Sequence, residues 1–284
     1  ALTSFAVGPI TGSSTVCAGS TITLSDATAG GTWSSSNATI ADVGSATGIV
    51  TGMMAGVATI SYTDGIGTAT KTITVNPLPI AYTVTGGGTF CAGDTGVHVG
   101  LSNSQVGVNY YLYVGSGVSG PYLGIGAPLD FGLQTASGIY TVVAINTSTL
   151  CSDFMTGGVT VTATPIVVPS VSIAISPNDT VCSGTSVTFT ATPVNGGTGP
   201  TYEWDVNGFN VGVTTAAYTY VPANGDIIEV KLTSDEMCAS PVTAFATVSM
   251  TLLNYHVPTA SIDPTPGDPI CMASAIIYMP LTSF

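Results

Sequence analysis

The chain has 284 residues, of which 6% are charged and only two are basic, so that its formal net charge is −13. Phosphate binding takes clustered Lys and Arg, so this charge argues against a nucleic-acid partner and against docking on an anionic membrane. The sequence has no run of about 18 apolar residues, so we expect no membrane-spanning helix. Its apolar residues are dispersed in short runs rich in Thr, Val and Ile, a pattern typical of β-strands.

Two features indicate an exported protein. Six cysteines in a β-rich chain are typical of an oxidising compartment. The sequence begins ALTSFAVG, without an initiator Met or a basic segment, as a mature protein does after its signal peptide has been removed. We therefore expect an extracellular or cell-surface location, and a surface with so few charges offers little resistance to packing against further copies of the chain.

One pattern occurs four times: a cysteine, then small residues, then alternating apolar residues. The copies read TVCAGSTITLSD from Thr15, TFCAGDTGVHVG from Thr89, TVCSGTSVTFTA from Thr180 and PICMASAIIYMP from Pro269. Their cysteines are 74, 91 and 89 residues apart, which is the size of an immunoglobulin-like sandwich. The pattern therefore predicts an all-β protein of tandem immunoglobulin-like β-sandwich domains.

Proline-bearing stretches precede the second, third and fourth copies, at 76–80, 164–170 and 256–269. Proline favours extended backbone, so these stretches indicate short, stiff linkers. We predict immunoglobulin-like domains over residues 1–76, 77–165 and 166–256. Residues 257–284 would then form a partial fourth repeat or a donor strand.

Within each predicted domain, apolar residues alternate with Thr or Ser, as half-buried strands require. In the first domain the strands fall at 20–26, 30–36, 48–54, 57–64 and 69–76, and in the second at 96–102, 108–115, 138–146 and 158–164. In the third they fall at 186–193, 201–208, 209–213, 216–222, 227–234 and 246–252. Asn207-Gly208 lies between two of these runs and predicts a type I′ hairpin turn. Alternation places Val187 and Phe189 in the third core.

The order of cysteines and aromatic residues predicts two disulfide bonds. Trp204 lies between Cys182 and Cys238, which is the immunoglobulin arrangement of a ring packed on an inter-sheet bond. In the second domain Tyr111 takes the place of the ring between Cys91 and Cys151. We therefore predict the pairs Cys91–Cys151 and Cys182–Cys238, each closing a loop of roughly 60 residues and contributing about 3–4 kcal/mol in the chain-entropy model.

Residues 32–63 resemble the bacterial Ig-like domain of group 2. The matching elements are TWSSSN at 32–37, ADV at 41–43, TGIVTG at 47–52 and AGVATI at 55–60. Residues 201–241 are similar to PKD-like Ig repeats, which recur in long surface proteins that gliding bacteria export by type IX secretion, and the second domain resembles the same group more loosely. The resemblance implies extracellular, non-catalytic modules strung end to end.

One departure from this resemblance concerns the remaining cysteines. Related domains often carry a second cysteine in the turn that reads YTDGIG here, where Ile66 stands instead. Cys17 therefore lacks an obvious partner in its own domain, and so does Cys271. Three alternatives remain open: two independent free thiols, a partner of Cys271 lost with the rest of the fourth repeat, or a Cys17–Cys271 bond between successive subunits.

The sequence offers little for catalysis or for binding a cofactor. Its two histidines, His98 and His256, lie in different repeats, and no motif places either beside a nucleophile. GSGVSG at 115–120 follows a strand but precedes a further β-like run, so it predicts a hairpin loop instead of a phosphate site. No Cys/His cluster suits zinc, and the pairs Asp263/Asp268 and Asp205/Asp226 are too sparse for calcium. We predict a protein that is not an enzyme and has no cofactor or metal.

Other candidate sites concern modification and ligand binding. Asn37, Asn146 and Asn178 begin N-x-S/T triplets, and the triplet DTV makes Thr180 a candidate for bacterial O-glycosylation. Tyr110 and Tyr220 are candidates for a surface that binds a glycan or a protein, although packing explains most tyrosines in strands.

The fourth repeat supplies one good strand, SAIIYMPL at 274–281, which cannot bury its face by itself. It could belong to a longer protein, fold back onto the third domain, or complete a sheet in another copy of the chain. The last alternative generates a head-to-tail filament. We therefore expect a structural subunit of an extracellular filament or stalk, with an adhesin segment as the alternative and a spacer for an enzyme domain as a third.

Overall fold

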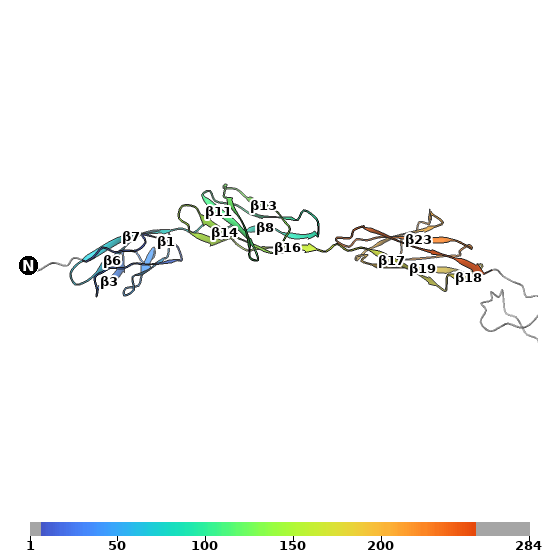
Figure 1. Cartoon of the computed structure of the whole chain (residues 1–284), viewed down its shortest axis with the longest axis horizontal. Helices are drawn as coiled ribbons and strands as arrows, with labels where there is room; N and C mark the ends of the chain where they lie inside the picture. Colours follow the sequence, from blue (N-terminus) through green and yellow to red (C-terminus); the bar gives the residue numbers. More distant parts are fainter. Residues whose placement is uncertain (1–6, 254–284) are drawn as a thin grey trace, which may run out of the picture. The chain divides into compact units, whose positions relative to one another are not determined.

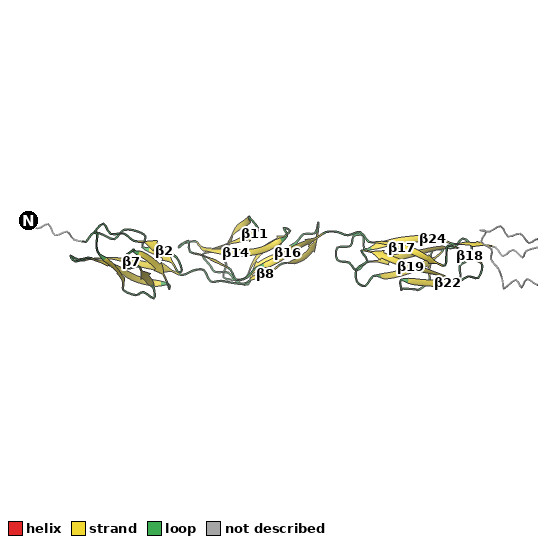
Figure 2. Cartoon of the chain, turned by 90° about the horizontal axis from the view of Figure 1, so that it is seen from below, coloured by secondary structure: helices red, strands yellow, loops and turns green. Residues whose placement is uncertain are grey.

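The computed structural model describes residues 7–253, and every regular element among them is a β-strand (Figures 1 and 2). The described chain forms two compact units, divided between Ala163 and Thr164. The first unit contains two hydrophobic cores and the second contains one. We call the parts around these cores the first (β1–β7), second (β8–β16) and third (β17–β25) domains. The predicted all-β fold of immunoglobulin-like sandwiches is confirmed, whereas the predicted boundaries at 76, 165 and 256 stay predictions.

The first domain packs a four-stranded sheet, in the order β1-β7-β6-β3, against a three-stranded sheet, in the order β2-β5-β4. Strand alternation creates its core, since every second residue of β6 is buried. Trp33 and Tyr62 pack with ring centroids 4.7 Å apart, and the Tyr62 hydroxyl donates to the Thr28 carbonyl at 2.6 Å. The strands are β1 (Thr15–Cys17), β2 (Thr21–Thr23), β3 (Thr32–Ser35), β4 (Ala41–Val43), β5 (Ile49–Gly52), β6 (Gly56–Thr63) and β7 (Thr68–Asn76).

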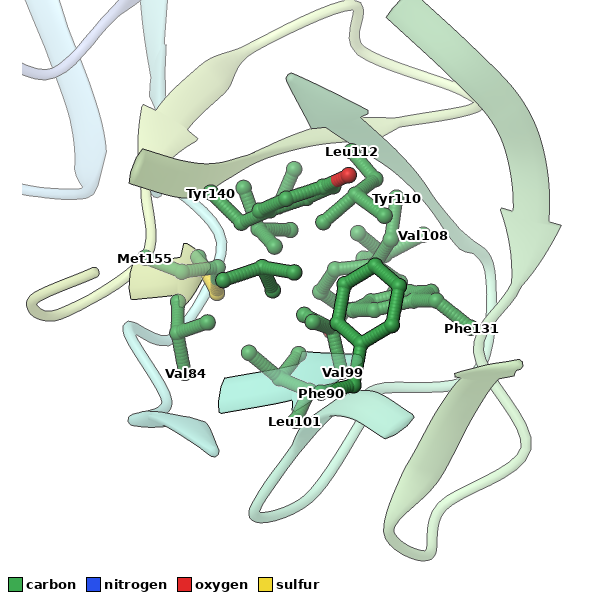
Figure 3. Packing of buried hydrophobic residues seen from close by; sticks show 13 residues of the cluster. Val84, Phe90, Val99, Leu101, Val108, Tyr110, Leu112, Phe131, Tyr140 and Met155 are labelled. Carbon is green, nitrogen blue, oxygen red and sulfur yellow. The ribbon is translucent and has the colours of Figure 1, made fainter. Parts of the chain in front are cut away.

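The second domain combines a six-stranded sheet, built on β12-β11-β14-β16-β9 with β15 beside β14, and a three-stranded sheet of β13-β10-β8. Figure 3 shows the side chains that fill the space between them, among them Phe90 and Phe131. Its strands are β8 (Val84–Gly86), β9 (Gly88–Cys91), β10 (Val97–Leu101), β11 (Val108–Val114), β12 (Gly117–Leu123), β13 (Leu129–Gln134), β14 (Gly138–Asn146), β15 (Ser152–Phe154) and β16 (Val159–Thr164). The GSGVSG segment forms the β11–β12 hairpin turn, as predicted, with Val114 opposite Gly117.

The tyrosine of β11 that enters the core of this domain is Tyr110, not the predicted Tyr111. Along β11 the buried residues are Val108, Tyr110 and Leu112, whereas Tyr111 is half-buried on the other face. A shift of one residue exchanges the two faces of a strand, and the register of β11 on β14 decides which tyrosine turns inward. The Tyr110 hydroxyl accepts a hydrogen bond from the Gln105 amide at 2.8 Å.

The third domain places β17-β19-β22 against β21-β20-β23-β24. Trp204 is fully buried and donates from Nε1 to the Thr215 carbonyl at 2.9 Å. Val187 and Phe189 are buried as predicted, and Asn207-Gly208 forms the predicted turn, with positive φ at both residues. The strands are β17 (Ser170–Ser176), β18 (Thr180–Cys182), β19 (Val187–Val194), β20 (Thr201–Val206), β21 (Phe209–Asn210), β22 (Ala217–Tyr220), β23 (Ile227–Thr233), β24 (Thr243–Ser249) and β25 (Thr251–Leu253).

The repeated cysteine pattern has the same structural role in the first and third domains. The residues TVC form a three-residue strand that runs parallel to the last strand of the domain, β1 beside β7 and β18 beside β25. Equivalent hydrogen bonds fix the two pairs, Thr74 N to Ser14 O and Thr251 N to Asp179 O, each 2.9 Å long. The cysteine therefore ends a short strand at the edge of the sandwich and precedes a turn, and the alternating core strand follows that turn.

Candidate functional site

Cys17 ends β1 at a point where several backbone contacts fix its position. It lies opposite Asn76 of β7, whose carbonyl accepts from the Ala18 amide at 2.9 Å. Its own carbonyl accepts from the Ser20 amide at 3.0 Å, which closes the turn after the strand. A Cβ added at Gly52 would lie 2.7 Å from the Cys17 carbonyl oxygen, so only glycine permits this approach of the two backbones.

Cys151 lies in the loop between β14 and β15 and is completely buried. Its carbonyl accepts from the Asn146 amide at 2.9 Å, which closes the loop. The Asn146 side chain accepts from the amides of Ser148 and Thr149, at 2.9 and 3.0 Å. Leu150 adopts a positive φ of 60° just before the cysteine. The loop is thus held from within, and it directs the Cys151 side chain to a fixed position.

Cys17 and Cys151 form a disulfide bond, with a Cα–Cα distance of 5.6 Å and a sequence separation of 134 residues. The bond joins the first strand of the first domain to the loop that follows β14 in the second. The predicted pair Cys91–Cys151 is therefore wrong, and so is the expectation of a free or inter-subunit Cys17. The sequence argument placed both partners in one sandwich, whereas folding brings the end of β1 beside a loop of the next domain.

The other described cysteines, Cys91, Cys182 and Cys238, are also disulfide-bonded, and none of the five cysteines within residues 7–253 is a free thiol. The predicted pair Cys182–Cys238 stays a prediction, and it depends on the same argument that failed for Cys151. Cys271 lies outside the described residues.

In the first domain the turn equivalent to the Cys151 loop is closed by Asp64, whose carboxylate accepts from the amides of Ile66 and Gly67.

Within residues 7–253, the polar residues considered for catalysis lie apart, except for one histidine–carboxylate pair. His98 Nδ1 lies 2.7 Å from Asp130 Oδ2, a contact that the sequence did not predict, and both side chains are well exposed. The hydrogen bond from His98 and a second from the Gly132 amide lower the pKa of Asp130. This pair joins β10 to β13 at the surface and is explained as a cross-strand contact.

No group of three or more metal-ligating side chains occurs among residues 7–253. Asp205 lies on β20 and Asp226 lies just before β23, and neither belongs to such a group. Asp263, Asp268 and His256 lie outside the described residues.

A hollow of about 260 Å³ opens between the β11–β12 hairpin and the loop after β13, and its walls include Leu112, Val114, Val118, Leu133 and Tyr140.

The two tyrosines predicted as ligand-binding candidates are held within the fold. Tyr110 is buried in the second core, so that prediction is wrong for it. Tyr220 is half-buried and stacks on Tyr218, with ring centroids 5.0 Å apart. Its hydroxyl donates to Asp226 Oδ2 at 3.1 Å, and burial together with this contact raises the pKa of Tyr220.

Asp226 connects two turns of the third domain. Its carboxylate accepts from the Asn207 side chain at 2.8 Å, from the Ala223 amide at 2.7 Å and from the Tyr220 hydroxyl. Asn207 in turn accepts from the Ile227 amide at 2.9 Å. Burial opposes ionisation of Asp226, but these hydrogen bonds outweigh it and lower its pKa below the ordinary value of 3.8.

Replacing Asp226 by Asn is therefore expected to destabilise the third domain by about 1–2 kcal/mol at pH 7, because three donors lose a charged acceptor. Because the folded pKa is lowered, the contribution of Asp226 is present above the ordinary pKa of 3.8 and is lost as the pH falls through the folded pKa. Urea unfolding between pH 6 and pH 3 should thus show a shallower decline in the variant. Asp179→Asn, at an exposed position, is the control. An equal decline in wild type and Asp226→Asn would contradict the role of the carboxylate.

The candidate glycosylation residues differ in accessibility. Thr180 is exposed as the first residue of β18, and its hydroxyl lies 3.3 Å from Asp179 Oδ1. Asn37 and Asn178 are exposed, whereas Asn146 is half-buried in the loop that holds Cys151. The structure is therefore compatible with modification of Thr180, and the modification itself stays a prediction.

Comparison with known proteins supports the fold and identifies one domain. Residues 11–75 match the family model of the bacterial Ig-like domain (group 2), which confirms the resemblance predicted from residues 32–63. No curated protein sequence matches the chain. The described part of the chain holds no helix capable of spanning a bilayer. The PKD-like resemblance and the origin in gliding bacteria stay predictions.

Solved structures of tandem domains are similar over most of the chain. The N-terminal four Ig domains of Dscam1 share 12% identity, with 87% of this chain and 72% of that chain covered and a TM-score of 0.28. An I-band fragment of titin shares 10% identity over 87% of this chain and 99% of that one, with a TM-score of 0.37. Fibronectin(III)-like modules of CbhA from Clostridium thermocellum share 17% identity over 63% and 100%, with a TM-score of 0.26. Nothing of these proteins' functions transfers to this chain at such identities and scores.

Proposed function

We propose that this chain is a non-enzymatic structural protein outside the cell, a subunit of a filament or stalk that transmits force through covalently joined Ig-like domains. Tandem domains of this kind are typical of structural and cell-surface proteins, and their families are typically non-catalytic. The observation that carries the proposal is the Cys17–Cys151 bond, which joins one domain to the next. Disulfide bonds at the described cysteines are consistent with an extracellular location.

The strand arrangement supports a mechanical role. In the third domain β18 and the last strand, β25, are parallel neighbours. A force that pulls the two ends of such a domain apart draws these strands past each other in opposite directions. All their hydrogen bonds are then loaded together instead of one after another, which is the arrangement that best resists extension.

The surface supports association of copies. Large apolar side chains are more than half exposed in the second and third domains, for example Val106, Leu150, Phe154 and Phe209. Only 6% of the residues are charged, so little repulsion opposes contact between copies. In this proposal a strand contributed by residues 274–281, which lie outside the described residues, completes a sheet of a neighbouring copy. The resulting head-to-tail contact does not close and so extends into a filament.

The adhesin alternative receives less support from the described residues. Its aromatic candidates are buried, as Tyr110 is, or engaged in the fold, as Tyr220 is. The hollow beside the β11–β12 hairpin has mixed walls, with Ser119, Gln134 and Thr135 beside the apolar residues, and does not by itself favour a glycan.

Electron microscopy of the purified chain at increasing concentration tests the proposal. Filaments are expected from the wild type and from Ile277→Val, but not from Ile277→Pro, because proline removes a backbone N–H that a paired strand needs. Monomeric elution at high concentration without filaments would contradict the proposal. Binding of the monomer to a glycan array would favour the adhesin instead.

A further inference from the structure

We infer that the Cys17–Cys151 bond is a force bypass, which keeps the cores of two domains out of the path of tension. The bond closes a loop that contains residues 18–150. Nearly all buried apolar residues of the first and second domains lie inside this loop. Those outside it are Ile10, Val16, Met155 and Val161.

The bypass follows from the order of covalent connections. Tension that enters before Cys17 and leaves after Cys151 passes through the sulfur–sulfur bond, which directly connects the two residues. The Cα atoms at the ends of the loop are held 5.6 Å apart, so the 133 residues between them cannot be stretched. Only the segments 7–16 and 152–163 then remain in the direct path of the force within this unit.

Without the bond, the force would take a different route. It would enter at β1, cross to β7 through their parallel pairing, and continue through the second domain. Once those contacts fail, the chain between the two cysteines extends. At about 3.3–3.6 Å per residue, the 134 residues of the separation would release roughly 440–480 Å of chain once the bond of Cys91, which lies inside the loop, is also removed.

The local structure at both ends of the bond suits this role. Cys17 is fixed by β7, by the turn to Ser20 and by the close approach of Gly52. Cys151 is fixed by its loop and is completely buried, so a thiol in solution can approach the bond only from the half-buried Cys17. The bond is formed in the folded protein and is in place before any force arrives.

The biological use of the bypass rests on the proposed mechanical function, but the bypass itself is a property of the purified chain. Single-molecule stretching of the full-length protein between terminal handles measures it. With Cys91→Ser in both proteins, so that its bond no longer restrains the loop, the Cys17→Ser/Cys151→Ser variant is expected to release roughly 440–480 Å more chain than the protein that keeps Cys17 and Cys151. Ile60→Ala, a cavity at a buried site inside the loop, is the matched control: it should unfold more readily in solution and release no additional length.

Equal lengths for these two proteins would overturn the inference. Should the double variant not fold, the Cys91→Ser protein held at constant force in a reducing buffer provides a second test. Reduction should then give extension steps of the same size, at a frequency proportional to the concentration of the reductant, and their absence would equally overturn the bypass. The two experiments distinguish the two claims. If filaments form but stretching shows no bypass, the proposed function stands and the bypass is wrong. If stretching shows the bypass but no filaments form, the bypass stands and the proposed function is wrong.

Discussion

Replacing Cys17 and Cys151 together by serine is expected to lower the free energy of unfolding of the unit formed by residues 1–163 by about 5 kcal/mol. The bond joins residues 134 apart, and in the chain-entropy model a closed loop of this length restricts the unfolded chain by about that amount. The free energy of unfolding of a typical domain is only about 5–15 kcal/mol, so the loss is a large part of the total.

Urea unfolding followed by tryptophan fluorescence measures this loss. Trp33 reports on the first unit alone when Trp204, the other tryptophan, is replaced by phenylalanine in every protein compared. With a urea dependence of about 1–3 kcal/mol per molar, the midpoint should fall by about 2 M or more. Ser20→Ala/Ser148→Ala changes two exposed serines close to the same cysteines and is the control. A midpoint equal to that of the control would show that the bond does not stabilise the unit.

The same protein allows the remaining connectivity to be determined. Proteolysis without reduction should yield one peptide pair that contains Cys17 and Cys151, and this pair should disappear in the double variant. Cys238 follows the strand β23 as Cys151 follows β14, so it occupies the equivalent position in the third domain. The peptide map therefore also tests whether Cys238 is joined to Cys182 or to a cysteine outside its own domain.

Replacing Trp204 by alanine is expected to destabilise the third domain by about 3–5 kcal/mol, as truncation of a fully buried large aromatic residue does. The indole packs near the rings of Phe189 and Tyr218, with centroids 6.5 and 6.0 Å away. Its removal leaves a cavity at the centre of the core and takes the indole donor away from the Thr215 carbonyl.

Circular dichroism and fluorescence separate this effect from any change in the first unit. In the variant Trp33 is the remaining tryptophan, and its fluorescence transition should keep its midpoint while the transition of the third domain moves to lower urea. Phe209→Ala removes an aromatic side chain that is 78% exposed, so it should change the stability by no more than about 0.5 kcal/mol. If Trp204→Ala and Phe209→Ala lowered the free energy of unfolding by similar amounts, Trp204 would not be a main contributor to the core of the third domain.

The first domain is stabilised without an inter-sheet disulfide, because its only cysteine is engaged with the second domain. Trp33 and Tyr62 are cross-strand neighbours on one sheet and pack in the core between the sheets, and the Tyr62 hydroxyl ties the segment around Thr28 to β6. The thiol that could have joined the two sheets instead joins two domains. This use of the cysteine is what turns two sandwiches into one covalently closed structure.

The sequence by itself determined many of the strands, though not β12, β13 or β17, and also the buried Trp204 and the turn at Asn207-Gly208. Each follows from interactions between residues close in the chain: alternation sets which side chains face inward, and positive φ at two adjacent positions selects Asn-Gly. The group 2 Ig-like pattern of the first domain was likewise readable from residues 32–63, because it is a continuous run of strand and turn signals.

The tertiary structure alone decided the partner of Cys17 and the direction of Tyr110. Six cysteines allow fifteen pairings, and the choice depends on which sulfur atoms meet after the chain folds. Here the end of β1 meets a loop that follows β14, 134 residues away and in another sandwich. Tyr110 and Tyr111 are equally aromatic neighbours, and only the pairing of β11 with β14 selects the one that enters the core.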